Sequence, residues 1–110
     1  MRQLREDEPV YMISVAARLC ELHPQTLRMY ERLGLVRPAR IGAKNRMYSE
    51  RDLDRLRQIQ RLTQDMGVNL AGVEVVLGLL ERMQHMRDEM DVEMERMRRE
   101  MEELLRRLEK

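Results

Sequence analysis

Residues 23–34 decide the fold, and they read His23-Pro24-Gln25-Thr26-Leu27-Arg28-Met29-Tyr30-Glu31-Arg32-Leu33-Gly34. Pro24 suits the first position of a helix, where a missing backbone N–H costs nothing, and Gly34 suits the left-handed residue that follows one. Leu27, Tyr30 and Leu33 recur every three residues, which indicates one face packed against a core. The stretch therefore predicts a short helix with well-defined ends.

The opposite face of this helix is polar and cationic. A helix start carries free backbone N–H groups and attracts anions, and a helix of this size fits the DNA major groove. We expect Gln25 and Thr26 to read bases, and Arg28 to contact a base or a phosphate. Tyr30 is expected to pack its ring inward while its hydroxyl reaches a phosphate. The alternative is an ordinary solvated helix face.

A second short helix precedes this one. Residues 10–13 are predicted to be extended, and Ser14 is a suitable N-cap for the helix that follows. The helix is predicted to last about three turns. Its expected apolar face consists of Val15, Ala16, Leu19 and Leu22. Two short helices that meet at a tight corner near His23 form a helix-turn-helix.

A basic segment follows Gly34. Between residues 36 and 51 the cations are Arg37, Arg40, Lys44, Arg46 and Arg51, and the only acid is Glu50. The whole chain has a net charge of +1, so this local excess points to a local polyanion site. Weak strand character at residues 40–41 and 46–48 predicts a hairpin, or wing. We expect Lys44, Arg46 and Tyr48 to grip the DNA backbone, although a solubilising loop is the simpler alternative.

Two further helices are predicted after the wing. Ser49 and Asp52 have the spacing of a capped helix start, and Asn69 is a suitable cap for the next helix. The first helix has its apolar stripe at Leu53, Leu56, Ile59, Leu62 and Met66, and Gly67 closes it. The second has its stripe at Leu70, Val73, Val76, Leu77 and Leu80. Gly78 lies inside this pattern, as a hinge or as a tolerated weak point.

From residue 83 onward the chain consists mainly of Met, Leu, Glu and Arg. Its apolar seam is Met83, Met86, Met90, Met94, Met97, Met101, Leu104 and Leu108. The steps of three and four form heptads with one stutter near Met90–Met94, which predicts a coiled coil roughly 40 Å long. A single helix cannot bury this seam, so we expect a homodimer. A pliable surface for a second protein is the alternative.

Composition limits the other functions. The chain has 110 residues, 37% of them charged, with no Phe or Trp, so it is expected to be one small domain with an extended appendage. One cysteine, Cys20, excludes an internal disulfide and a cysteine-cluster metal site, and it is expected to lie in the core. We find no catalytic constellation, no cofactor motif, no signal peptide and no membrane span. The sequence thus predicts a cytoplasmic protein that is not an enzyme.

Two separate blocks of the sequence resemble MerR-type transcriptional regulators. They are residues 13–16 with 26–36, and residues 46–48 leading into Asp52-Leu53. Within that family, residues 23–28 and 64–73 are similar to the heat-shock repressors. The resemblance covers about residues 10–80. Met29 departs from the tyrosine that MerR-type activators often carry at this position.

The resemblance implies a winged helix-turn-helix dimer, joined through an antiparallel coiled coil, that binds inverted-repeat operators in double-stranded DNA. It implies repression of chaperone genes with the chaperone DnaK as co-repressor. The family's DNA contacts carry over to Arg28, Tyr30, Arg46 and Tyr48. The cysteines of metal-sensing members and the large domain of drug-sensing members are absent, so no metal and no small-molecule effector is expected.

The sequence thus predicts an all-α dominated fold with a small β wing. We expect a flexible N-terminus over residues 1–9, the DNA-binding domain over 10–81 and the coiled-coil dimerisation helix over 82–110. Two alternatives to a repressor remain. One is a MerR-type activator that distorts promoter DNA, and the other is a coiled-coil adaptor that binds proteins only.

Overall fold

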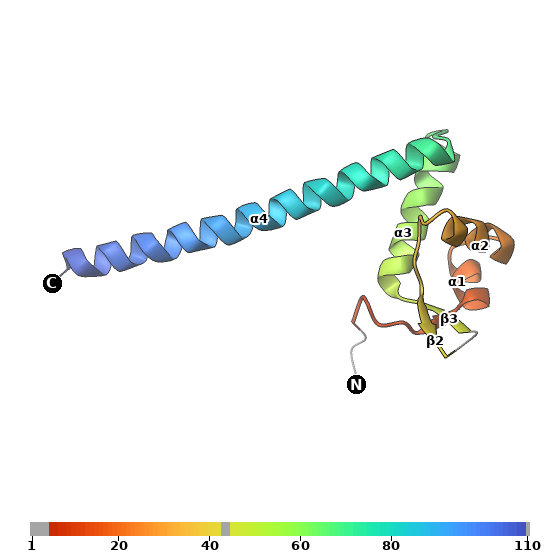
Figure 1. Cartoon of the computed structure of the whole chain (residues 1–110), viewed down its shortest axis with the longest axis horizontal. Helices are drawn as coiled ribbons and strands as arrows, with labels where there is room; N and C mark the ends of the chain where they lie inside the picture. The colour runs from red at the N-terminus through yellow and green to blue at the C-terminus, as the bar shows by residue number, and fades with distance from the viewer. Residues whose placement is uncertain (1–4, 43–44, 110) are drawn as a thin grey trace. The chain divides into compact units, whose positions relative to one another are not determined.

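Helices dominate the fold, as the sequence predicts (Figure 1). The structure is a computed structural model that describes residues 5–42 and 45–109. The chain divides into two units, with the boundary between Val73 and Glu74. We call the described residues up to Val73 the head.

Helices α1 (Ile13–Leu19) and α2 (Pro24–Arg32) form the predicted helix-turn-helix. Pro24 is the first residue of α2, and Gly34 adopts the left-handed φ of +77° that the sequence indicates for the helix end. His23 is the N-cap of α2, and its Nδ1 accepts a hydrogen bond from the Gln25 backbone N–H at 3.0 Å. These local signals define both ends of α2.

The start and the buried face of α1 differ from the prediction. The N-cap is Met12, without a side-chain hydrogen bond, and Ser14 lies exposed inside the helix. The buried residues of α1 and its C-cap are Ala16, Ala17 and Cys20, whereas Val15 and Leu19 are exposed. A helical spacing allows several faces, and the structure buries the face with small side chains, which lets neighbouring elements approach closely.

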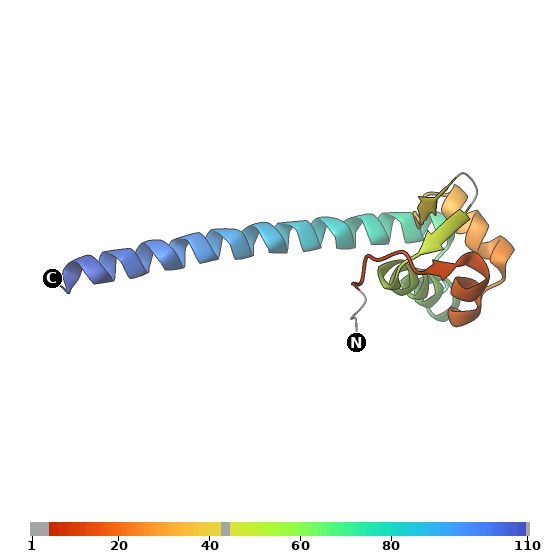
Figure 2. The ribbon, with the colours of Figure 1, turned by 90° about the horizontal axis from the view of Figure 1, so that it is seen from below.

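The wing is a hairpin of β2 (Ala39–Ile41) and β3 (Asn45–Tyr48), which confirms the predicted strands. The extended segment before α1 supplies β1 (Tyr11–Met12), which pairs antiparallel with β3 and opposes Tyr11 to Tyr48. The sheet order is therefore β1-β3-β2, and the three strands lie side by side in Figure 2. Strand β1 therefore connects the wing to the start of α1.

Helix α3 (Glu50–Gln60) begins with the predicted capping box. The Ser49 hydroxyl accepts from the Asp52 N–H at 3.1 Å, and the Asp52 carboxylate accepts from the Ser49 N–H at 2.9 Å. The predicted stripe is buried at Leu53, Leu56 and Ile59. These residues form the head's core, together with Leu27, Tyr30, Leu35, Val36, Tyr48 and Val73. Leu33, predicted to face this core, is the C-cap of α2 and lies exposed.

The predicted α-helical stripe does not continue to Met66. A π-helical turn, η1 (Arg61–Asp65), follows α3, and Gly67 then takes a φ of +67°. A π turn holds more residues than an α turn, so it rotates the face that later residues present. Met66 consequently lies exposed rather than in the stripe.

Helix α4 (Leu70–Leu108) is continuous over 39 residues and passes through Gly78 without a break. Asn69 caps it as predicted, because its Oδ1 accepts from the Gly72 N–H at 2.8 Å. All eight seam residues, Met83 to Leu108, have at least 54% of their surface exposed. Ion pairs at helical spacing, such as Arg96 with Glu93 and Glu100, line the helix outside the seam. Within the described residues no helix is both long and apolar enough to span a bilayer.

Candidate nucleic-acid interface

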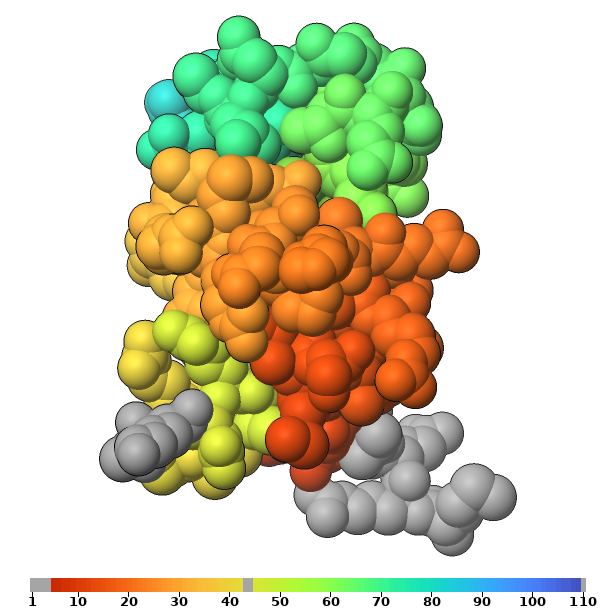
Figure 3. All heavy atoms as spheres, turned by 90° about the vertical axis from the view of Figure 1, so that its right-hand side faces the viewer, coloured from red at the N-terminus to blue at the C-terminus, as the bar shows by residue number. Residues whose placement is uncertain are grey.

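The exposed face of α2 begins at the His23 cap. Gln25 is exposed, and Thr26 and Arg28 are half-buried, so all three side chains reach the surface. They belong to the first turns of α2, where backbone N–H groups favour an anion. Figure 3 shows α1 (red to orange), α2 (orange) and the hairpin (gold to yellow-green) together on one face of the molecule. This face can present a helix and a wing to the same ligand.

The two tyrosines predicted at the interface lie in the core. Tyr30 is buried, as the expected packing of its ring requires, and the phosphate role of its hydroxyl stays a prediction. Tyr48 has 0% of its surface exposed, and its hydroxyl has no hydrogen-bond partner among the described residues. Burial raises the pKa of Tyr48 to about 12. In this conformation the Tyr48 side chain, at the end of β3, is part of the head's core and does not reach a phosphate.

Arg46, predicted to contact the DNA backbone, is paired with Glu31 of α2. The Arg46 Nε lies 2.6 Å from Glu31 Oε2 and 2.8 Å from Oε1. The Nη2 of Arg40 lies 3.6 Å from the same carboxylate. Sequence analysis did not single out Glu31, because its partners Arg40 and Arg46 lie 9 and 15 residues further along the chain, in the hairpin. The predicted Lys44 lies outside the described residues.

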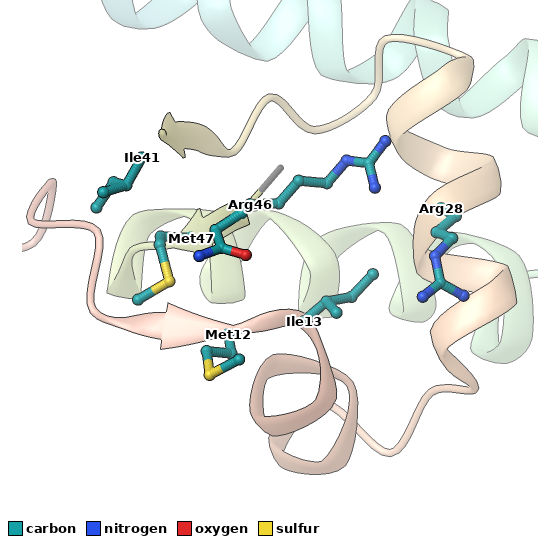
Figure 4. Close-up of a pocket in the computed structure, with 7 residues that line it drawn as sticks. Met12, Ile13, Arg28, Ile41, Arg46 and Met47 are labelled. Carbon is teal, nitrogen blue, oxygen red and sulfur yellow. The ribbon is translucent and has the colours of Figure 1, made fainter. Parts of the chain in front are cut away.

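A hollow of about 430 Å³ separates α2 from the sheet (Figure 4). It is lined by Met12, Ile13, Arg28, Ile41, Asn45, Arg46 and Met47. Arg28 borders it from α2, and the Arg46 side chain extends from β3 towards that helix. Two guanidinium groups beside methionine and isoleucine side chains suit a ligand with an anionic group on an apolar body. A sugar–phosphate backbone has this chemistry.

Cys20 is buried, as expected, and its Sγ lies 3.8 Å from the Leu53 carbonyl oxygen, to which it can donate. Burial raises the pKa of the Cys20 thiol, so the thiol remains protonated at neutral pH. Among the described residues, His, Cys, Asp and Glu side chains form no group that could hold a metal ion.

Comparisons with known proteins identify relatives of this chain. The family described as "MerR HTH family regulatory protein" matches residues 11–79. A Streptomyces coelicolor protein that carries the name heat shock protein HspR is 58% identical over 77 residues. The alignment covers 70% of this chain and 51% of that protein, so the chain spans about half the length of this relative.

Solved structures of similar fold are also transcription regulators. PbrR691 of Ralstonia metallidurans CH34, solved in complex with lead(II), is 28% identical with a TM-score of 0.62. The match covers 86% of this chain and 77% of PbrR691. HiNmlR, a MerR family regulator lacking the sensor domain and bound to promoter DNA, has a TM-score of 0.55 at 24% identity. That match covers 78% and 76% of the two chains, and supports the fold alone.

Proposed function

The chain belongs to the MerR family of helix-turn-helix regulatory proteins, and we propose that it represses heat-shock genes as a DNA-bound homodimer. Like its relatives, which are regulatory proteins, it is a transcription regulator and not an enzyme. The 58% identity with a protein named HspR carries the heat-shock part of the proposal. The DNA-binding part is supported by the cationic face that α2 and the wing share.

In the proposed complex, α2 enters a major groove. Gln25 and Thr26, at the start of the helix, read base edges, and Arg28 contacts a base or a phosphate. The hollow beside Arg28 receives the flanking sugar–phosphate backbone, with Arg46 of β3 on its other side. Lys44, outside the described residues, is proposed to contact the same backbone. Each cation that neutralises a phosphate releases counterions and makes binding depend on salt.

Two copies pair through the seam of α4, which otherwise leaves eight large apolar side chains exposed to water. We propose that this pairing is an antiparallel coiled coil. A two-fold dimer presents two heads related by symmetry, and therefore requires an inverted-repeat operator. We also propose, from the resemblance to heat-shock repressors, that the chaperone DnaK is the co-repressor. Binding of DnaK and operator would then be coupled reciprocally.

Selection of bound fragments from random DNA tests this function. The expected result is a palindromic site that the purified protein binds far more tightly than random duplex. Gln25→Ala is expected to relax the sequence preference, whereas Arg28→Ala is expected to weaken binding to the selected site. Protein that binds all duplexes equally, or none, would contradict the DNA-reading role and favour a protein-binding adaptor.

Transcription in vitro from a promoter with the selected site tests the direction of regulation. A repressor lowers transcript yield, and purified DnaK is expected to strengthen that effect and tighten operator binding. A rise in transcript accompanied by bending or untwisting of the DNA would instead identify an activator. Unchanged operator affinity with DnaK would remove the co-repressor from the proposal and leave DNA binding intact.

A further inference from the structure

Glu31 of α2 forms ion pairs with both strands of the wing. Its carboxylate lies within 2.6 Å of the Arg46 Nε and within 3.6 Å of the Arg40 Nη2, so two strands of the wing share one anion. The Glu31 side chain is only 15% exposed, while that of Arg40 is 63% exposed. A shielded carboxylate is screened less by salt than a surface pair is. The contact is therefore able to persist at physiological ionic strength.

The charges around Glu31 have one sign. The described residues of α2, β2 and β3 contain four arginines, Arg28, Arg32, Arg40 and Arg46, and Glu31 is their only acid. Glu31 thus compensates part of the charge on the face that α2 and the wing present. Arg46 is also one of the two cations that border the hollow beside α2.

Non-specific DNA binding comes almost entirely from cations that reach phosphates, and it needs no fixed geometry. Base reading does need one, because a helix must sit in a groove at a set register while the backbone contacts hold it there. A carboxylate that holds the wing's arginines against α2 affects both non-specific binding and base reading. It withholds positive charge from arbitrary phosphates, and it fixes the wing relative to the helix that reads bases.

We propose that Glu31 is a positioning residue that determines DNA specificity by holding Arg46 and Arg40 of the wing on α2. The inference rests on the proposed DNA-binding function. It extends that function to a residue that carries the wrong charge for a DNA contact. In the wild-type protein the pair limits binding to random duplex and keeps the wing in register on the selected site.

The test is the substitution Glu31→Gln, which removes the charge and keeps the size of the side chain. The salt dependence of binding to random duplex is expected to steepen by about 0.9 in the logarithmic slope for each arginine released to a phosphate. Random-duplex affinity is expected to rise at low salt, and the ratio of specific to random binding is expected to fall at least about tenfold. Glu31→Asp keeps the charge, so its salt slope on random duplex should stay close to that of the wild type.

Two comparisons separate this effect from a general change of charge or fold. Asp54→Asn removes one negative charge from an exposed position on α3 and is expected to leave the specificity ratio unchanged. In a double-mutant cycle, Glu31→Gln is expected to steepen the slope less when Arg46→Gln is already present. Circular dichroism establishes the temperature range in which each variant is folded.

The outcomes distinguish the two proposals. A wild-type protein that binds no duplex overturns the DNA-binding function, and this inference with it. A wild-type protein that selects a palindrome, together with a folded Glu31→Gln variant of unchanged slope and ratio, overturns the role of Glu31 alone. The role of Glu31 is also overturned if Glu31→Gln steepens the salt slope by the same amount with and without Arg46→Gln. Arg46 would then not be the residue that Glu31 holds.

Discussion

Gln60 of α3 donates from its Nε2 to the carbonyl oxygen of Cys20 at 2.6 Å, across 40 residues of sequence. The Cys20 carbonyl lies at the end of α1, where the chain turns towards α2 and Glu21 takes a φ of +55°. Carbonyl groups at a helix end have no partner within the helix. This hydrogen bond therefore helps to hold the corner of the helix-turn-helix on α3, together with the contact of the Cys20 Sγ with the Leu53 carbonyl oxygen.

Gln60→Ala is expected to destabilise the protein by about 1 kcal/mol or more, because the Cys20 carbonyl loses its side-chain donor. The measurement is urea unfolding followed by circular dichroism, at one protein concentration for all variants, since dimer stability depends on concentration. Gln58→Ala, a matched change at another half-buried position of α3, is the control. Equal losses in the two variants would mean that the hydrogen bond does not fix the corner.

The capping box of α3 supplies a second test. Ser49→Ala removes the hydroxyl that accepts from the Asp52 N–H, and a lost N-cap costs about 1 kcal/mol. Ser14→Ala is the matched control, because Ser14 is exposed inside α1 and caps nothing there. Its effect is expected to stay within about 0.5 kcal/mol. A cost at Ser14 as large as at Ser49 would place the N-cap of α1 at Ser14, against the structure.

These caps show which parts of the fold local sequence determines. Pro24, Gly34, Ser49 and Asn69 act within four residues of their partners, and each has the role that its chemistry predicts. The apolar stripes were predicted less well. Helical spacing marks a face but not where the regular helix ends. It predicts Leu33 and Met66 in the core, whereas Leu33 is the C-cap of α2 and Met66 follows the π-helical turn, and both lie exposed.

The parts that sequence analysis missed depend on distant residues. The pairing of β1 with β3 joins residues 37 positions apart, as at Tyr11 and Tyr48, and no local pattern specifies it. The same holds for Glu31, whose partners in the wing are recognisable only after the hairpin is folded against α2. The charge of the wing was apparent from composition. The pairing of two of its arginines with Glu31 was not apparent.

The buried hydroxyl of Tyr48 gives a third prediction. Because it has no hydrogen-bond partner among the described residues, Tyr48→Phe is expected to leave stability at neutral pH unchanged or slightly higher. DNA affinity should also be unchanged, since the side chain has no exposed surface. Quantitative binding to the selected operator checks this. A clear loss of affinity in Tyr48→Phe would show that the hydroxyl reaches a phosphate in the complex.

The same substitution changes the dependence of stability on alkaline pH. Burial raises the pKa of Tyr48 from an ordinary 10 to about 12, so the folded state holds the proton more tightly than the unfolded state. The resulting stabilisation is complete below pH 10 and is lost as the pH rises from 10 to 12. Urea unfolding at several pH values in this window should show a steeper loss for the wild type than for Tyr48→Phe. Parallel curves would contradict the burial.

The last prediction concerns the seam of α4. Met94 belongs to it and Val92 does not, yet both side chains are more than 60% exposed in the single chain. If two copies pair along the seam, Met94→Lys places a charge in the middle of the interface, where it is desolvated without a partner. The dimer is then expected to dissociate at least about tenfold more readily, a change of about 1.4 kcal/mol.

Val92→Lys introduces the same charge outside the seam and is expected to leave the dimer intact, because its side chain stays in water. Sedimentation equilibrium measures both dissociation constants, and operator binding follows as a second readout. Because the two heads must contact one inverted repeat together, Met94→Lys is expected to weaken operator binding and Val92→Lys is not. Equal effects of the two variants, or a wild-type protein that is monomeric while it binds the palindrome tightly, would place the dimer contact elsewhere than on the methionine seam.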